Sequence, residues 1–428
     1  MNLRNCMIGQ SGGPTAAINA SLAGVISKAL ESNAFEHVYG AINGIEGLLE
    51  NRYLDLTTPF KDPILLSKLA KTPAMYLGSC RYKLPQIPEN ATNLTVIKEY
   101  ELIFSIFKEL NITDFFYIGG NDSMDTVMKL SKYAKLHGSQ IHFIGVPKTI
   151  DNDLDGTDHT PGFGSAAKFV ATSMLEIIHD SMIYNTKSVT IVEVMGRNAG
   201  WLTAATALSR SNHQTSPDLI YLPEVVFDIH QFLQSIETLF KTRRNIIIAV
   251  SEGVRDKNGN FLEEEAFCQD ENTTLSSSKT DVFGHVIHDG TGKVLENIVR
   301  NNFGCKTRSI ELNVLQRCAM HIASKTDLEE SFEVGEAAVC ASLSSKSGVM
   351  ITMQRTQTQE GTYKMLTSLK DINLVANVEK KVPIEWISPQ RNDITKELYD
   401  YLYPLVQGEV QLEYKNGVPD YMDIQHLL

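Results

Sequence analysis

A lysine and a group of carboxylates crowd one short segment of the chain. Lys148, Thr149, Asp151 and Asp153 follow one another directly after an apolar run that ends at Pro147. One carboxylate there could accept a proton, while the lysine or a metal ion stabilises a transferred anion. A solvated charged loop is the alternative, but it would not need so many carboxylates beside a lysine. The segment is therefore a candidate for a general base with a neighbouring cation.

Two glycine turns offer backbone N–H groups to phosphate. Gly12 and Gly13 precede one predicted helix, and Gly119-Gly120 precede Asn121, Asp122 and Ser123 at the start of another. A turn of this kind lets the backbone approach a phosphate, assisted by the helix dipole, and the polar side chains could bind magnesium. The alternative readings are a plain tight turn at the first site and an ordinary helix cap at the second.

Several charged side chains follow other predicted strands. Arg197 and Glu252 each come just after a β-branched run, and Arg308 and Arg317 lie within one later stretch. Single arginines are usually surface residues, but three at the ends of strands in one chain suggest an anion site.

The elements that must position these residues alternate regularly. Strands are predicted at 6–9, 115–118, 141–146, 189–194 and 246–250, with helices at 15–31, 123–134 and 199–208. A further strand is predicted at 348–354. Alternation of this kind predicts an α/β fold with doubly wound parallel sheets, in which ligands bind beyond the carboxyl ends of the strands.

Length and composition set wider bounds. At 428 residues we expect two domains: 1–160, and 161–320 with an irregular insertion near 255–302, while 321–428 complete them. The net charge of −12 gives no support to nucleic-acid or anionic-membrane binding. No segment reads as a membrane span or signal peptide, and six scattered cysteines without a CxxC pair are typical of reduced thiols. We therefore expect a cytoplasmic protein.

Taken together, the clusters resemble the phosphofructokinase family. The matching segments, in order, are SGGPTAAIN, GSCR, GGNDS, PKTIDND, GTDHTPGF, VEVMGR, SEG and TRSIELNVLQR. They cover roughly residues 5 to 345, and TIDND followed by VEVMGR is highly specific. The resemblance implies two Rossmann-like domains with the active site in the cleft between them. The first domain would mainly bind the phosphoryl donor, and the second mainly fructose 6-phosphate.

The resemblance also implies roles for single residues. Asp151 matches the base that takes the proton from the sugar C1 hydroxyl, Asp153 its neighbouring carboxylate, and Thr149 a residue that touches the reacting groups. Gly13 and Arg81 match positions near the donor phosphates. The positions that match the sugar site are Met195, Gly196, Arg197 and Glu252, with Arg308 and Arg317 holding the 6-phosphate.

Two departures point to the phosphoryl donor. ATP-using members resemble GGDGS and PGTIDND, whereas this chain carries Asp122 and Lys148 where those members carry glycine. Both substitutions resemble the pyrophosphate-using branch. A carboxylate at 122 would repel the α-phosphate of a nucleotide, and the ammonium at 148 could compensate a small, highly charged donor. Asp122 and Ser123 are therefore assigned to the donor, with Asp122 as the first candidate for holding Mg²⁺ and Asn121 as the second.

Other readings stay open at this stage. They are an ATP-dependent phosphofructokinase, a non-catalytic sugar-phosphate-binding subunit, and an enzyme that also accepts another sugar phosphate such as sedoheptulose 7-phosphate. Asn121 and Val314 depart from the family pattern, where an aspartate and often a histidine stand. The resemblance implies a glycolytic enzyme that acts as a homodimer or homotetramer.

Overall fold

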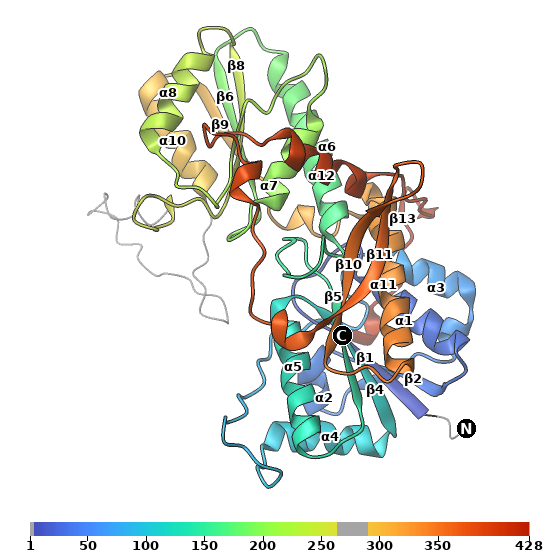
Figure 1. The fold of residues 1–428 in the computed structure, drawn as a ribbon. Helices are drawn as coiled ribbons and strands as arrows, with labels where there is room; N and C mark the ends of the chain where they lie inside the picture. Colours follow the sequence, from blue (N-terminus) through green and yellow to red (C-terminus); the bar gives the residue numbers. More distant parts are fainter. Residues whose placement is uncertain (1–3, 263–289, 428) are drawn as a thin grey trace. The chain divides into compact units, whose positions relative to one another are not determined.

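The computed structural model describes residues 4–262 and 290–427. The chain divides into two compact units, which we describe separately (Figure 1). Unit 1 comprises Met1–Ser165, Arg317–Glu379 and Gln407–Leu428, and unit 2 comprises Ala166–Gln316 and Lys380–Val406. The divisions lie near the predicted boundaries at 160 and 320, and the C-terminal stretch contributes to both units. The predicted division of labour between the domains, and the active site between them, stay predictions.

Unit 1 contains a seven-stranded sheet in the order β11-β10-β5-β4-β1-β2-β3. The five central strands run parallel, while β11 and β3 pair antiparallel at the two edges. The predicted parallel sheet is thus correct for the centre and incomplete at the edges. The strands are β1 (Arg4–Gln10), β2 (Phe35–Ala41), β3 (Tyr53–Asp55), β4 (Ile112–Gly119), β5 (His142–Pro147), β10 (Val349–Gln357) and β11 (Tyr363–Asp371).

Side chains of the central strands alternate between two cores, one on each face of the sheet. Cys6 and Ile8 of β1 point to the face that is covered by α1 (Ile18–Glu31) and α11 (Lys325–Leu343). Met7 points to the opposite face, which α2 (Gly44–Leu49), α4 (Lys98–Glu109) and α5 (Asn121–Leu136) cover. Strands that are buried on both faces are expected to be almost wholly apolar, which explains the continuous hydrophobic runs in the sequence.

Unit 2 is built on a four-stranded parallel sheet in the order β7-β8-β6-β9. The strands are β6 (Ser188–Val194), β7 (Leu219–Tyr221), β8 (Asn245–Ser251) and β9 (Lys306–Glu311). Helices α8 (Ile229–Leu239) and α10 (Thr291–Phe303) pack their apolar side chains on one core with β6 and β8. Three other α-helices of the described residues are α3 (Pro63–Ala70) in unit 1, and α7 (Trp201–Ala205) and α12 (Lys396–Leu402) in unit 2. Helix α6 (Phe163–Met182) contains the first division between the units. A small hairpin, β12 (Tyr414–Lys415) and β13 (Val418–Pro419), lies in unit 1.

The expectation of irregular structure near 255–302 is wrong for residues 291–302. These residues form most of α10, which begins after Gly290 and ends at Gly304, both with left-handed backbone. Leu295 and Val299 lie one helical turn apart and are fully buried. Their apolar side chains pack this mostly polar helix against the core. The part of the predicted insertion that spans 263–289 lies outside the described residues. Within the described ranges, no helix combines the length and apolarity that crossing a bilayer would require.

Candidate active site

The candidate active site of unit 1 forms where β1, β4 and β5 end side by side. Lys148 follows β5 directly, and its backbone N–H donates to the carbonyl of Gly119 at the end of β4 (2.9 Å). Its ammonium donates to the carbonyl of Gly13 in the turn after β1 (2.7 Å). The lysine therefore joins the two predicted glycine turns, as expected for loops at the carboxyl edge of a parallel sheet.

Burial makes Lys148 unusual. The residue is only 2% exposed, and a buried ammonium is stable only when anionic or carbonyl oxygens compensate it. The pKa of Lys148 is lowered to about 8 in total: burial lowers it most, the charges of Asp151 and Asp153 raise it, and the positive charge of Arg317 lowers it. The lysine is thus still mainly cationic at neutral pH.

The pKa of the neighbouring Asp153 is shifted in the opposite direction from that of Lys148. Burial, and then the negative charge of Asp151, raise the pKa of Asp153 to about 7. With a pKa near 7, the Asp153 carboxyl is protonated for about half of the time at neutral pH, which reduces the negative charge beside Asp151. A reduced negative charge there favours Asp151 as the proton acceptor of the pair.

The backbone around Thr149 is held from two directions. The Thr149 hydroxyl accepts from the Asp151 N–H (3.1 Å), while the Thr149 N–H donates to the carbonyl of Pro161 (3.2 Å). The hydroxyl of Thr160 donates to the Thr149 carbonyl (2.8 Å). Residues 160–162 therefore hold the catalytic loop in place through these bonds and an isolated parallel bridge between Thr149 and Gly162.

The second glycine turn is tightly packed against the first. The hydroxyls of Ser11 and Ser123 lie 2.5 Å apart. A Cβ at Gly119 would lie 1.9 Å from the Ser123 Oγ, so no larger residue fits there. The glycine at 119 thus allows Ser123, in the first turn of α5, to lie directly beside the first glycine turn.

Asp122 and Asn121 present oxygens of different character. The Asp122 carboxylate is exposed and forms an ion pair with Lys83 (3.2 Å). The side-chain oxygen of Asn121 is buried and has no hydrogen-bond partner. An orphaned buried oxygen needs a partner, and a cation is one that would satisfy it. Lys83 was not predicted, although it lies only two residues after Arg81.

The predicted arginines fall in different parts of the chain. Arg81 is exposed and follows Ser79, whose hydroxyl donates to the Gly12 carbonyl (2.7 Å). Arg317 belongs to unit 1, where its carbonyl accepts from the Ala16 N–H just after the first glycine turn (2.9 Å). Its guanidinium is close enough to lower the pKa of Lys148. Arg317 therefore lies beside the predicted donor residues, a neighbourhood that the sequence did not indicate.

In unit 2, the residues predicted for the sugar gather at the ends of β6 and β8. The Gly196 N–H, directly after Met195, donates to the Glu252 carboxylate (3.2 Å), and Gly196 has a positive φ of 128°. A Cβ at Gly253 would lie 1.8 Å from the Arg197 carbonyl, so the two turns touch. The predicted set Met195, Gly196, Arg197 and Glu252 is thus brought together.

Arg308 is found on the neighbouring strand β9. Its guanidinium pairs with Asp180 (3.0 Å), and both side chains are partly exposed. A partly exposed arginine that pairs with an exposed carboxylate can exchange that partner for a phosphate. Whether Arg308 and Arg317 bind one phosphate stays a prediction.

Glu193 and Asp327 were missed by the sequence reasoning. Glu193 is buried on β6 and accepts from the Gly292 N–H at the start of α10 (2.6 Å). Asp327 accepts from the N–H groups of Gly162 and Ser165 (both 2.9 Å), which fixes the turn after the catalytic loop. Neither carries a local signal, because each partner lies far away in sequence.

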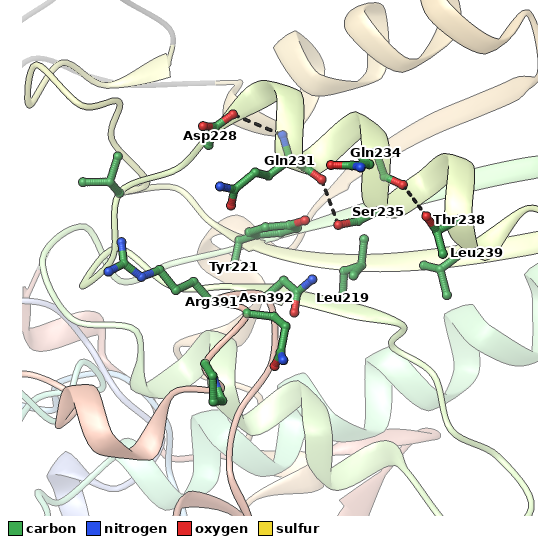
Figure 2. A pocket seen from close by; sticks show the side chains of 13 residues that line it. Leu219, Tyr221, Asp228, Gln231, Gln234, Ser235, Thr238, Leu239, Arg391 and Asn392 are labelled. Atoms are coloured by element: carbon green, nitrogen blue, oxygen red, sulfur yellow. Dashed lines mark hydrogen bonds between the residues drawn. The ribbon is translucent and has the colours of Figure 1, made fainter.

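A cavity of about 710 Å³ in unit 2 contains none of the predicted residues. It is lined by α8, by Tyr221 of β7 and by residues 389–392, and Figure 2 shows Arg391 and Asn392 opposite the helix. Its size is in the usual range for ligands, but its lining offers no carboxylate–lysine cluster. The chemistry of this chain is therefore expected at the loops, away from this cavity.

Similarity to known proteins shows the family to which the chain belongs. The family model "Phosphofructokinase" matches residues 5–310, so the chain belongs to the phosphofructokinase family. More particularly, it is 37% identical over 427 residues to the pyrophosphate–fructose 6-phosphate 1-phosphotransferase of Methylococcus capsulatus, covering 99% of this chain and 96% of that one. The protein of the same name from Halomonas elongata is also 37% identical, with coverages of 98% and 96%.

A solved structure agrees with these relatives. The chain resembles the crystal structure of a pyrophosphate-dependent phosphofructokinase from Nitrosospira multiformis, with a TM-score of 0.84 and 37% identity. The match covers 98% of this chain and 96% of that one. The predicted family and the predicted α/β fold are confirmed.

Proposed function

We propose that this protein transfers a phosphoryl group reversibly from inorganic pyrophosphate to the C1 hydroxyl of fructose 6-phosphate. The products are fructose 1,6-bisphosphate and phosphate. The observation that carries the proposal is Lys148, a buried cation that joins both glycine turns and faces two carboxylates. Assay of the purified protein with pyrophosphate against ATP tests the proposal directly.

Asp151 is the base in this mechanism. It accepts the proton of the C1 hydroxyl as that oxygen attacks the phosphorus of the donor, and free phosphate leaves. The neighbouring Asp153 is only partly ionised near neutral pH, because its pKa is raised to about 7. A non-catalytic sugar-phosphate-binding protein would have no use for such a pair.

Lys148 and the turn amides hold the charge of the donor. Pyrophosphate has no adenosine to anchor it, so its binding energy must come from a few strong contacts with its oxygens. A buried ammonium is suited to this, since the low local polarity strengthens its attraction for an anion. Arg81 and Arg317 add further positive charge near the same turns. Phosphoryl transfer depends mainly on such positioning and charge stabilisation.

Magnesium fits the donor side of this site. Mg²⁺ takes oxygen ligands and is usually held by one or two protein groups together with substrate phosphates. Asp122 would supply a carboxylate and Asn121 its unpartnered buried oxygen. No cluster of three or more metal-binding side chains occurs among the described residues, which agrees with a metal held largely by the donor. Bound magnesium would neutralise charge on the phosphoryl group.

The metal assignment predicts an order of effects. Asp122→Asn should raise the magnesium concentration for half-maximal activity more than Asn121→Ala does, because a carboxylate is the stronger ligand. The measurement is a magnesium titration of activity at fixed pyrophosphate. Lys83→Ala is the matched variant: it frees the Asp122 carboxylate and should lower the requirement. A larger effect at Asn121 would contradict the assignment.

Arg308 is proposed to bind the 6-phosphate of the sugar. Charge-assisted hydrogen bonds contribute roughly 1.5–3 kcal/mol, so Arg308→Ala should raise the KM for fructose 6-phosphate about tenfold to a hundredfold. Initial rates at saturating donor measure this. Asp180→Ala removes the competing carboxylate and should leave this KM unchanged or lower it. If Arg308→Ala raises the KM for pyrophosphate instead, the arginine serves the donor.

A further inference from the structure

A buried histidine lies directly behind the catalytic loop and takes no part in the reaction described above. His159 is 2% exposed and follows the loop at a distance of six residues from Asp153. Its Nδ1 lies 2.8 Å from the Asp158 carboxylate, and its Nε2 lies 2.7 Å from the Glu330 carboxylate on α11. Both ring nitrogens therefore face acceptors.

This geometry determines the protonation state. A neutral imidazole carries one N–H, so the other nitrogen would place its lone pair against a carboxylate. Only the imidazolium can donate to both partners. Burial alone would lower the pKa of His159, but the bonds to Asp158 and Glu330 outweigh burial and raise it.

The groups around the ring complete a closed charged network. Arg355 of β10 donates to the Asp158 carboxylate (3.1 Å), and Tyr363 of β11 donates its hydroxyl to Glu330 (2.7 Å). The histidine and arginine lower the pKa of Asp158 to about 2, despite its burial. The other charged groups nearby are Asp327, one turn before Glu330 on α11, and Glu333 one turn after it.

The same segment is bonded to the catalytic loop. Thr160, the residue after His159, donates to the Thr149 carbonyl, and the Thr149 N–H donates to Pro161. Thr149 in turn accepts from the Asp151 N–H. A displacement of the segment at 159 would therefore reach the proposed base through two hydrogen bonds.

We propose that His159 is a positioning residue, charged at neutral pH, which ties the segment behind the catalytic loop to α11 and so fixes Asp151 for proton transfer. The catalytic part of this inference rests on the proposed function. The protonation state and the structural tie do not, and they can be measured without turnover.

Nitrogen NMR of the ring tests the protonation state. The His159 signals are assigned by their loss in His159→Gln, and both ring nitrogens should remain protonated at pH 7.5, where an ordinary histidine is neutral. A ring that is singly protonated at pH 7 would overturn the proposal. This outcome is independent of whether pyrophosphate is a substrate.

Stability should depend on pH in a matching way. The folded-state pKa is raised, so the stabilisation by His159 is full below its unfolded pKa and is lost as pH rises through the folded pKa. The free energy of unfolding of the wild type, measured in urea, should therefore fall as pH rises through the folded-state pKa of His159. His159→Gln should not show this fall. An identical pH dependence in the two proteins would count against the charged network.

Kinetics with a matched control separate positioning from general stability. His142 also pairs with a buried carboxylate, Asp114 (2.9 Å), but at the opposite end of β5 from the catalytic loop. Misplacement of a catalytic group by about 1 Å can cost 10²-fold, so His159→Gln should lower kcat by on the order of ten to a hundredfold with little change in KM. His142→Gln should leave kcat near normal. Equal kcat in the two variants would overturn the positioning role.

Glu330→Gln keeps the proposal testable should His159→Gln fail to fold. It retains the shape of the side chain and removes one of the two negative charges that stabilise the imidazolium. The pH at which the ring loses its second proton, and the pH at which kcat falls on the alkaline side, should both move down. If neither moves, Glu330 does not hold the ring in its charged form.

Discussion

Asp151→Asn is expected to lower kcat by ~10²–10⁴-fold, the range that a positioned general base contributes. The amide has nearly the same shape as the carboxylate but cannot take the proton of the sugar hydroxyl. The KM values for both substrates should change little, because the arginines, Lys148 and the turn amides remain. Steady-state rates in both reaction directions, together with direct binding of each substrate, measure this.

Asp153→Asn is the matched comparison for that experiment. The pKa of Asp153 is raised to about 7, so an amide there imitates the protonated form that is well populated near neutral pH. Its kcat should fall much less than that of Asp151→Asn. If Asp153→Asn is the more damaging change, the two carboxylates have the opposite roles. Near-normal turnover in Asp151→Asn would remove the base from the mechanism altogether.

The second large effect is expected on the choice of donor. The double change Asp122→Gly with Lys148→Gly should shift the ratio of kcat/KM for ATP over pyrophosphate by about 10²–10³-fold. Loss of the buried Lys148 removes a charge-assisted contact of roughly 1.5–3 kcal/mol with pyrophosphate. Loss of Asp122 relieves repulsion of a nucleotide, but this carboxylate is exposed and paired with Lys83, so solvent screening makes its share smaller.

The single variants divide these contributions. Lys148→Gly alone should mainly reduce turnover with pyrophosphate, and Asp122→Gly alone should admit ATP better than Lys148→Gly does. Lys83→Ala should leave the donor ratio closer to wild type, since it alters the partner of Asp122 and not the carboxylate. A double variant whose ratio does not move would remove these two residues as the explanation of donor choice.

Local patterns in the sequence were sufficient to predict the strands that carry the catalytic loops. β4, β5, β6 and β8 were each predicted from short apolar runs, because strands buried on both faces leave that signature. The convergence of Gly13 and Lys148 follows from the same reasoning, since neighbouring parallel strands end at one edge. The helix predicted from residue 15 begins at Ile18 with Ala17 as its N-cap, and the Thr15 hydroxyl accepts from the Ile18 N–H (3.0 Å).

Contacts between residues that are far apart in the sequence could not be predicted from local patterns. The contact between His159 and Glu330 joins residues 171 positions apart, and no local pattern connects them. The helix at 291–303 was missed because polar residues dominate it and only one stripe is apolar. The location of Arg317 beside Lys148 depends on where the chain returns to unit 1, which composition does not reveal.

The central claim is that pyrophosphate is the phosphoryl donor. The most direct test is the initial rate of fructose 1,6-bisphosphate formation by the purified wild-type protein, with fructose 6-phosphate and magnesium, at matched concentrations of pyrophosphate and ATP. The account predicts that kcat/KM for pyrophosphate greatly exceeds that for ATP, with one phosphate released per bisphosphate formed. A wild-type protein that prefers ATP would contradict it.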